Sequence, residues 1–297
     1  MPEANEDYND THRAFLQAIL SRQVLTFEQA RPLLAKIQTA QNPDRPVLEN
    51  DISREDFEQH IEIINNVLSP LDYEIRTQLH QKTKDRIYAL VNVSSDALTQ
   101  MSTTYSADEI AFLKRVLDAI FLSKNTRRAE ILAISGMQAI RLGKIPRDGG
   151  ESQARAQDLT QMQAEQMLDS LVAQGWFEQS QHGFFSLSPR ALMELRGWLI
   201  ETYNDRDYTE DDDDGDSAEP HQKIKFCQAC KDIVTEGQRC PTLTCEARLH
   251  NHCVRYMFRA QGGRELCPLC TVSWHDALPV GEGAARNARR SVNGTRG

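Results

Sequence analysis

Seven cysteines and one histidine near the C-terminal end of the chain have the types and spacing of metal ligands. All seven cysteines lie between Cys227 and Cys270. With His250 they form four close pairs: Cys227/Cys230, Cys240/Cys245, His250/Cys253 and Cys267/Cys270. A tetrahedral zinc takes four Cys or His ligands, so these residues suffice for two ions. Disulfides alone would leave one of the seven thiols unpaired, and thiolate ligands require a reducing compartment.

The spacing leaves open how two ions share these ligands. Two ions in series would take the first four ligands and then the last four, whereas interleaved ions would take alternate pairs. His250 is the preferred imidazole ligand, because His252 adjoins Cys253 and neighbouring side chains diverge too much to chelate one ion easily. We expect His275 at the surface. Since protein would fill every coordination position, the pattern predicts structural zinc and no open catalytic site.

The rest of the composition predicts a soluble intracellular chain of two or three domains. It has 297 residues and no apolar run near the ~20 residues that span a bilayer. The first ten residues are acidic and polar, unlike a secretory signal. The net charge is −9, and residues 205–219 contribute nine acids and one arginine to it. This acidic run predicts a disordered linker before the cysteine-rich segment.

Residues 106–204 have the pattern of three helices followed by a hairpin. Ser106 and Glu109 form a capping box before a run with helical apolar spacing. Further helices are expected over residues 127–140 and 158–174. The inward residues of the first would be Ile131, Leu132, Ile134 and Met137, and those of the second would include Met162, Met167, Leu168 and Leu171.

A hairpin and one more helix complete this second half. Strands over residues 176–178 and 184–187 flank a short turn that contains Gly183. Ser188-Pro189 then predicts the start of a single last helix. Its apolar face would carry Leu192, Leu195, Leu199 and Ile200.

The first half of the chain has a similar pattern. Helices are expected over residues 12–22, 26–40 and 53–68, and a hairpin over residues 73–78 and 86–91. Three helices followed by a hairpin is the order of the winged helix, a variant of the helix-turn-helix. The sequence thus predicts a mainly α fold with small β-sheets, in which tandem winged helices precede the zinc module.

The charge of the third helix in each half favours protein contact over DNA contact. Residues 54–62 hold one arginine and four acids, and residues 158–174 hold no Lys or Arg. A helix that reads the major groove would be basic, and these helices would repel phosphate. Basic residues at Lys82, Lys84 and Arg86 on the first hairpin are more typical of a solvated surface.

The order of the ligands, with four cysteines, then one histidine, then three cysteines, resembles that of the cross-braced RING and PHD zinc modules. This resemblance favours the interleaved arrangement. One zinc would be held by Cys227, Cys230, His250 and Cys253, and the other by Cys240, Cys245, Cys267 and Cys270. A PHD reader usually has a tryptophan two residues before its seventh ligand, for a methyl-lysine cage, and Glu265 occupies that position here. A histone-reading role is therefore disfavoured.

The layout over roughly residues 8–280 resembles the non-SMC element 1 family, the RING-bearing subunit of the Smc five–six chromosome-maintenance complex. The likeness is carried by residues 88–120 between the two halves and by residues 267–279, which include Trp274 and Pro279. It implies a nuclear, chromatin-associated subunit in DNA repair and recombination. It also implies a MAGE-type partner on the winged helices, a kleisin-type partner, and ubiquitin-ligase activity with a ubiquitin-conjugating enzyme.

Under that resemblance, apolar residues beside the ligands would dock the conjugating enzyme. Pro268 and Leu269 between the last two ligands are the candidates, with Ala229 on the facing turn and Tyr256, Met257 and Phe258 nearby. Active RINGs usually have a larger residue at the position of Ala229, and many have an arginine at the position of Thr271, so we expect weak activity without the partner. A subunit whose zinc module only docks partners is the alternative. DNA contact would be weak or made through the complex, and no membrane contact is expected.

The chain is expected to have six consecutive segments. A flexible N-terminus covers residues 1–10, winged helix A residues 11–105, winged helix B residues 106–204, the acidic linker residues 205–222, the RING-like module residues 223–280, and a disordered basic tail residues 281–297.

Overall fold

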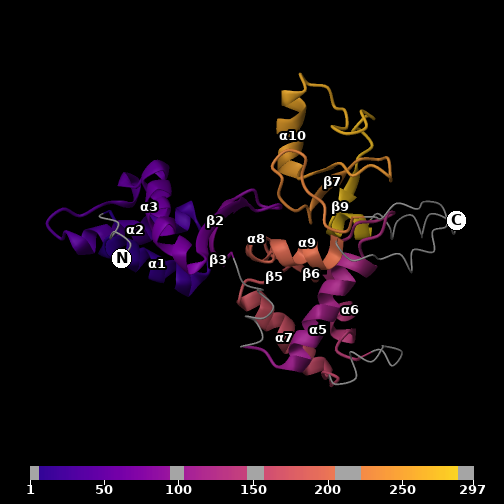
Figure 1. Ribbon diagram of the computed structural model, residues 1–297, viewed down its shortest axis with the longest axis horizontal. Helices are drawn as coiled ribbons and strands as arrows, with labels where there is room; N and C mark the ends of the chain where they lie inside the picture. The colour runs from indigo at the N-terminus through magenta and orange to yellow at the C-terminus, as the bar shows by residue number, and fades with distance from the viewer. Residues whose placement is uncertain (1–6, 94–103, 146–156, 205–221, 287–297) are drawn as a thin grey trace. The chain divides into compact units, whose positions relative to one another are not determined.

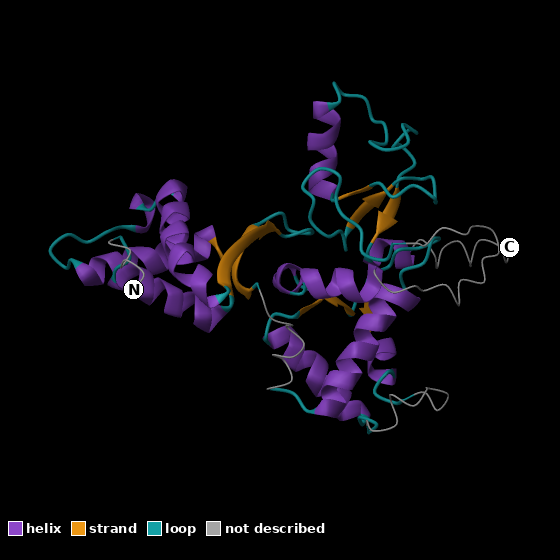
Figure 2. Cartoon of the chain, in the orientation of Figure 1, coloured by secondary structure: helices purple, strands orange, loops and turns teal. Residues whose placement is uncertain are grey.

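The computed structural model describes residues 7–93, 104–145, 157–204 and 222–286. Helices predominate, and the strands form three short sheets (Figures 1 and 2). The chain divides into two compact units. One comprises Met1–Ala97 with Pro189–Glu194, and the other comprises Leu98–Ser188 with Leu195–Gly297. Among the helices in the described ranges, none combines the length and apolar character that a bilayer crossing needs.

The first unit contains three main helices and a three-stranded antiparallel sheet. Its elements are α1 (Asp10–Arg22), β1 (Val24–Thr26), α2 (Phe27–Gln41), η1 (Glu49–Asp51), α3 (Arg54–Leu68), η2 (Ser69–Leu71), β2 (Tyr73–Leu79) and β3 (Arg86–Asn92). The sheet order is β1-β3-β2. The predicted helices and hairpin are therefore present. The short strand β1, which pairs Val24 with Ala89, was not predicted.

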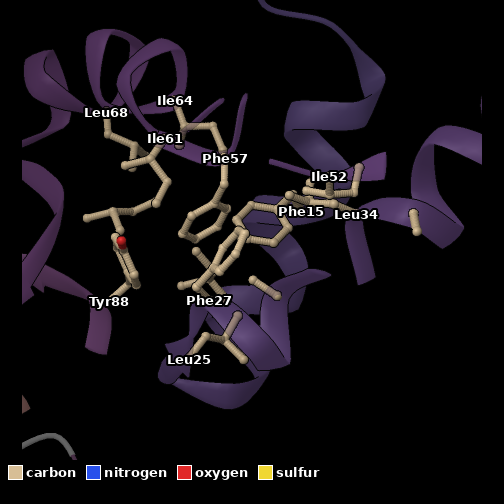
Figure 3. Packing of buried hydrophobic residues seen from close by; sticks show 14 residues of the cluster. Phe15, Leu25, Phe27, Leu34, Ile52, Phe57, Ile61, Ile64, Leu68 and Tyr88 are labelled. Carbon is tan, nitrogen blue, oxygen red and sulfur yellow. The ribbon is translucent and has the colours of Figure 1, made fainter. Parts of the chain in front are cut away.

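Capping side chains and an aromatic core explain this fold. Asn9, Thr26 and Ser53 each accept a hydrogen bond from a first-turn amide of the helix that follows, which satisfies backbone donors that have no partner within the helix. Phe57 packs edge-on against Phe15 and Tyr88, with ring centroids 5.9 and 4.8 Å away. Figure 3 shows Phe15, Phe27 and Phe57 close together, with Tyr88 beside them. All of these aromatic side chains are buried.

The predicted last helix is two helices in the structure. α8 (Pro189–Glu194) belongs to the first unit, and α9 (Arg196–Asn204) belongs to the second. Met193 of α8 packs against residues of β3, and Arg190 Nη1 donates a 2.6 Å hydrogen bond to Gln23 Oε1. The prediction of one continuous helix is wrong because α8 covers the first sheet, so its apolar residues need not share a face with those of α9.

The second unit repeats the helix and hairpin order and adds the cysteine-rich segment. Its first part contains α5 (Ala107–Asp118), the π-helical turn η3 (Ala119–Ser123), β4 (Ile134–Ser135), α6 (Gly136–Arg141), α7 (Gln161–Ala173), β5 (Phe177–Gln179) and β6 (Phe184–Leu187). The sheet order is β4-β6-β5. Ser106 forms the predicted capping box with Glu109. Each half thus has the element order expected of a winged helix.

The helix predicted over residues 127–140 is wrong. Residues 124–133 form a turn-rich loop, Ile134 pairs with Phe185 in the sheet, and only the six residues of α6 are helical. Leu132 has a φ of 46°, which an α-helix cannot contain. Met137 and Met162, both expected inside, are 73% and 70% exposed. The apolar residues between 131 and 137 have the spacing of a helical face. The strand β4 has only two residues, too few to show the alternation of apolar and polar residues that marks a strand.

The described cysteine-rich part of the second unit contains the helix α10 and a small sheet, and residues 282–286 are also helical. Its elements are β7 (Gly237–Arg239), β8 (Arg248–Leu249), α10 (Asn251–Ala260) and β9 (Leu278–Val280), with sheet order β8-β7-β9. Figure 1 labels α10, β7 and β9. Order continues beyond residue 280, where a disordered tail was predicted. Ala284 and Ala285 are buried there, since small side chains allow this segment to pack closely. The predicted acidic linker lies outside the described residues, apart from residue 222.

Candidate metal centre

The first group of candidate ligands combines Cys227 and Cys230 with His250 and Cys253. Their ligand atoms all lie within 4.8 Å of one another. His250 Nδ1 is 3.2 Å from Cys230 Sγ and 4.0 Å from Cys253 Sγ. The two cysteines of the first pair come from a tight turn, which we call the first knuckle (residues 227–230). His250 caps the start of α10, and Cys253 lies in its first turn.

The second group combines Cys240 and Cys245 with Cys267 and Cys270. Their sulfur atoms also lie within 4.8 Å of one another. Cys240 Sγ is 3.4 Å from Cys270 Sγ, and Cys245 Sγ is 3.6 Å from Cys267 Sγ. Cys267 and Cys270 come from a turn that we call the second knuckle (residues 267–270). The grouping takes alternate pairs along the chain, which is the interleaved arrangement and not the serial one.

These distances fit a tetrahedral ion of the size of zinc. With zinc–sulfur bonds of about 2.3 Å, the sulfur atoms of a tetrahedral site lie roughly 3.8 Å apart. The sulfur–sulfur distances of 3.4 and 3.6 Å are close to that edge. One group offers three sulfurs and an imidazole, and the other offers four sulfurs. The described residues therefore include two Cys/His groups that can each hold a metal ion.

A backbone contact orients the imidazole of His250. Its Nε2 lies 3.2 Å from the carbonyl oxygen of Ile233, and the residue is 1% exposed. A proton on Nε2 would donate to this carbonyl and leave the Nδ1 lone pair toward the cysteines, the usual arrangement around a metal-binding histidine. His252 stacks on His250 with ring centroids 5.0 Å apart and lies outside the group.

The two knuckles have the same backbone conformation. The amide of Lys231 donates to the carbonyl of Cys227 at 2.9 Å, and the amide of Thr271 donates to the carbonyl of Cys267 at 3.1 Å. Lys231 and Thr271 have φ values of 65° and 58°, in the left-handed region. Each knuckle thus turns the chain back over its sulfur atoms through an equivalent hydrogen bond. Thr271, a β-branched residue, adopts this region at a cost in strain.

The residues expected to dock a conjugating enzyme differ in exposure. Leu269, between the ligands of the second knuckle, is 53% exposed, whereas Pro268 and Ala229 are half-buried. Tyr256 on α10 is exposed. Phe258 is buried and packs against Trp274 with ring centroids 6.1 Å apart, so it belongs to the core of the module.

A buried acid from the loop between η3 and β4 contacts three cations of the cysteine-rich segment, and no sequence pattern indicated it. Glu130 Oε2 accepts a 2.6 Å hydrogen bond from Arg248 Nε, and Oε1 also pairs with Arg248 Nη2. Lys225 Nζ and Arg239 Nη1 lie 2.9 and 3.2 Å from Oε1. All four side chains are at most 5% exposed. We call this set the Glu130 cluster.

The cations around Glu130 stabilise the negative charge of its carboxylate. Burial alone would raise the pKa of the carboxyl group, but the hydrogen bond from Arg248 and the positive charge of Lys225 outweigh it. Together with Arg239 they lower the pKa of Glu130 to about 2. The carboxylate is therefore ionised at every pH near neutrality, and the cluster is an ion network.

Family models match two parts of the chain. Residues 12–195 match the model described as "Nse1 non-SMC component of SMC5-6 complex". Residues 227–270, from the first candidate ligand to the last, match the model described as "RING-like domain".

Curated relatives and a solved structure are similar over most of the chain. Proteins named "Non-structural maintenance of chromosomes element 1 homolog" from Rattus norvegicus and Homo sapiens are each 26% identical over 270 residues, 91% of this chain and 86% of theirs. The Schizosaccharomyces pombe protein of the same name without "homolog" is 22% identical over 94% of this chain and 98% of its own. A chain in a structure titled "Nse1-Nse3-Nse4 complex" has a similar fold, with a TM-score of 0.68, 21% identity, and coverage of 91% of this chain and 99% of that chain.

Proposed function

The chain belongs to the family of Nse1 non-SMC components of the SMC5-6 complex, and from that premise we propose that it is a RING-type ubiquitin-protein ligase subunit of the complex. The RING-like module holds a ubiquitin-charged conjugating enzyme so that the thioester faces a substrate lysine. This is catalysis by positioning, because protein ligands would fill all coordination positions of both metal groups.

The observation that carries this proposal is the exposure of Leu269. This side chain is 53% exposed, although Cys267 and Cys270 on either side of it both belong to the second group. The hydrogen bond from the Thr271 amide to the Cys267 carbonyl fixes the backbone around it. A fixed apolar side chain loses little conformational entropy when a partner covers it. With half-buried Pro268 beside it, Leu269 supplies an apolar contact for the conjugating enzyme.

We propose zinc as the ion in both groups. Three thiolates with one imidazole, and four thiolates, are donor sets that tetrahedral structural zinc prefers. In the first group Cys227, Cys230, His250 and Cys253 would hold the ion, and in the second Cys240, Cys245, Cys267 and Cys270. Each ion would contribute folding free energy to a segment whose own apolar core is small.

The partners follow from the family and from surface charge. A structure of similar fold is titled for an Nse1-Nse3-Nse4 complex, and we extend assembly of this kind to this chain, with one MAGE-type and one kleisin-type subunit. Glu55, Glu58 and Glu62 are exposed on α3, where a basic surface would favour DNA. The winged helices therefore contact protein, and DNA contact is weak or made through the complex. The place of action is the nucleus, in DNA repair and recombination.

A ubiquitination assay with matched leucine variants tests the ligase proposal. Leu269→Ala removes about three methyl or methylene groups from the contact, on the order of 2 kcal/mol or thirtyfold in affinity. Leu243→Ala is the control, because Leu243 is 43% exposed in the same module but outside the second knuckle. In the complex with both partners, chain synthesis should fall with Leu269→Ala alone. Both variants must retain two zinc ions. Equal activity of the two variants contradicts the proposed surface.

A non-enzymatic assembly subunit is the second candidate, favoured by the small side chain of Ala229 on the first knuckle. A larger aliphatic residue there would add apolar area to the docking surface. Ala229→Ile should therefore raise ubiquitin-chain synthesis by the isolated chain. If the assembled complex makes no ubiquitin chains with either the native chain or Ala229→Ile, the assembly role is the correct one.

A further inference from the structure

We propose that Glu130 is a positioning residue that attaches the RING-like module to the second winged helix in one orientation. The module would then be a fixed part of this unit, although the sequence suggests an appendage behind an acidic linker. The attachment itself follows from the contacts of Glu130. Its consequence for ubiquitin transfer, a docking surface held at a set orientation, rests on the proposed function.

The backbone around Glu130 presents the carboxylate rigidly. Asn125 and Glu130 form a β-bridge, and the amide of Ile131 donates to the carbonyl of Lys124 at 3.0 Å. Asn125 and Glu130 are each 1% exposed. The loop that replaces the predicted helix over residues 127–140 is therefore closed on itself, with Glu130 pointing to the module and not to solvent.

The cations that meet Glu130 all come from the module, and two of them also contact the backbone near its second metal group. Arg248 Nη1 donates to the carbonyl of Cys245 at 2.7 Å while its other nitrogens contact Glu130. Arg239 Nη2 donates to the carbonyl of Leu243 at 3.2 Å, and its Nη1 donates to the carbonyl of Arg127 at 2.9 Å. These two arginines thus link the winged-helix loop to the chain between Cys240 and Cys245.

Without Glu130 the module would bury more positive charge than it could pair. Lys225, Arg239 and Arg248 bring three cations to one buried place. Glu246 also contacts Lys225, at 3.2 Å, but its side chain is 42% exposed. Removal of one partner from a buried ion network leaves uncompensated charge, which is costlier than the loss of a surface pair. The favoured response is for water to enter between module and winged helix.

Other contacts join the same two surfaces and serve as reporters. The amide of Gly281 donates to the carbonyl of Glu130 at 2.8 Å. The amides of Lys223 and Ile224 donate to Asn204 Oδ1 at 3.0 and 2.8 Å. These three amides report on the attachment, whereas the amides of Lys231 and Thr271 close the knuckles inside the module.

Amide hydrogen exchange of the zinc-loaded full chain distinguishes detachment of the module from unfolding of the module. Glu130→Gln keeps the shape of the side chain and removes its charge. We expect the amides of Gly281, Lys223 and Ile224 to exchange faster by on the order of 100-fold, while those of Lys231 and Thr271 keep their rates. Glu130→Asp, which keeps the charge, should restore part of the protection. Glu246→Gln is the matched control, since it alters the same lysine from within the module, and it should leave all five amides unchanged.

Two results would overturn the proposal. Unchanged protection at the three attachment amides in Glu130→Gln would mean that the ion network does not hold the module. Equal acceleration of all five amides, or loss of zinc, in both Glu130 variants would mean that Glu130 maintains the folding of the module and not its position. A wild-type complex that makes no ubiquitin chains would refute the ligase proposal and leave the exchange result intact.

Discussion

Arg248 and Glu130 are 118 residues apart in the chain and meet through two nitrogens of one guanidinium and both oxygens of one carboxylate. Arg248 is 0% exposed, and its remaining Nη1 donates to two backbone carbonyls, including that of Cys245. The same side chain thus contacts the loop before β4 and the backbone of Cys245, a candidate metal ligand. This geometry requires the planar fork of arginine.

Arg248→Lys should destabilise the second unit by about 3 kcal/mol. A lysine keeps the charge but cannot reach both carboxylate oxygens and both carbonyls, so buried acceptors lose their donors. Urea unfolding of the zinc-loaded chain, followed by tryptophan fluorescence, measures the effect. Arg264→Lys is the control, because Arg264 is exposed and makes one long hydrogen bond of 3.4 Å. Equal midpoints for the two variants would contradict the account.

The first unit should lose stability as the pH falls from about 6.5 to about 4. His60 is 8% exposed and stacks on His12 with ring centroids 4.0 Å apart. Burial, and then the nearby charge of His12, lower the pKa of His60 to about 4. Between the two pKa values the unfolded chain binds a proton that the folded chain does not, so folding weakens as pH falls. Between pH 7 and pH 5 the loss should be about 2 kcal/mol.

His60→Phe tests this pH dependence, because a phenyl ring can still stack on His12 but cannot titrate. Urea unfolding followed at the amides of α3 should show a smaller loss between pH 7 and pH 5 than in the native chain. His275→Gln, at a side chain 86% exposed, should keep the native pH dependence. An undiminished pH dependence in His60→Phe would show that another group is responsible.

Gly237→Ala should weaken the first metal group more than the second. A Cβ at Gly237 would overlap the carbonyl oxygen of Leu249 and lie 3.2 Å from the Cα of His250. Because these are backbone atoms, β8 must shift and carry His250 with it. A chelator competition should then remove one zinc ion from this variant well before the other. Gly197→Ala, where an added Cβ meets nothing within 4 Å, should bind both ions as the native chain does. Loss of both ions together would contradict this explanation.

Local signals predicted much of the fold. Ser53 and Ser106 cap the helices that they were expected to begin, since a side-chain cap depends only on residues within one turn. The helix expected over residues 158–174 is α7, and it ends before Gly175, which has a φ of 70°, with the amide of Trp176 donating to the carbonyl of Leu171. The grouping of ligands came from resemblance, because spacing alone allowed a serial arrangement as well.

Long-range contacts account for what the sequence did not predict. Glu130 lies in a segment whose apolar residues have helical spacing, and nothing near it in sequence indicates a partner 118 residues away. α8 packs on β3 within the first unit, whereas α9 belongs to the second unit. The apolar residues over 189–204, which have the spacing of one helix, are therefore divided between two helices. Strands β1 and β4 have three and two residues, too few for an alternating pattern.

The most direct test of the account is the assignment of each ligand to its ion. In the chain loaded with ¹¹³Cd in place of zinc, a two-dimensional proton–cadmium correlation spectrum links the protons of each ligand side chain to one of two cadmium signals. The account predicts one signal with Cys227, Cys230, His250 and Cys253, and the other with Cys240, Cys245, Cys267 and Cys270. A spectrum in which Cys240 and Cys245 share an ion with Cys227 and Cys230, or in which His252 replaces His250, would contradict it.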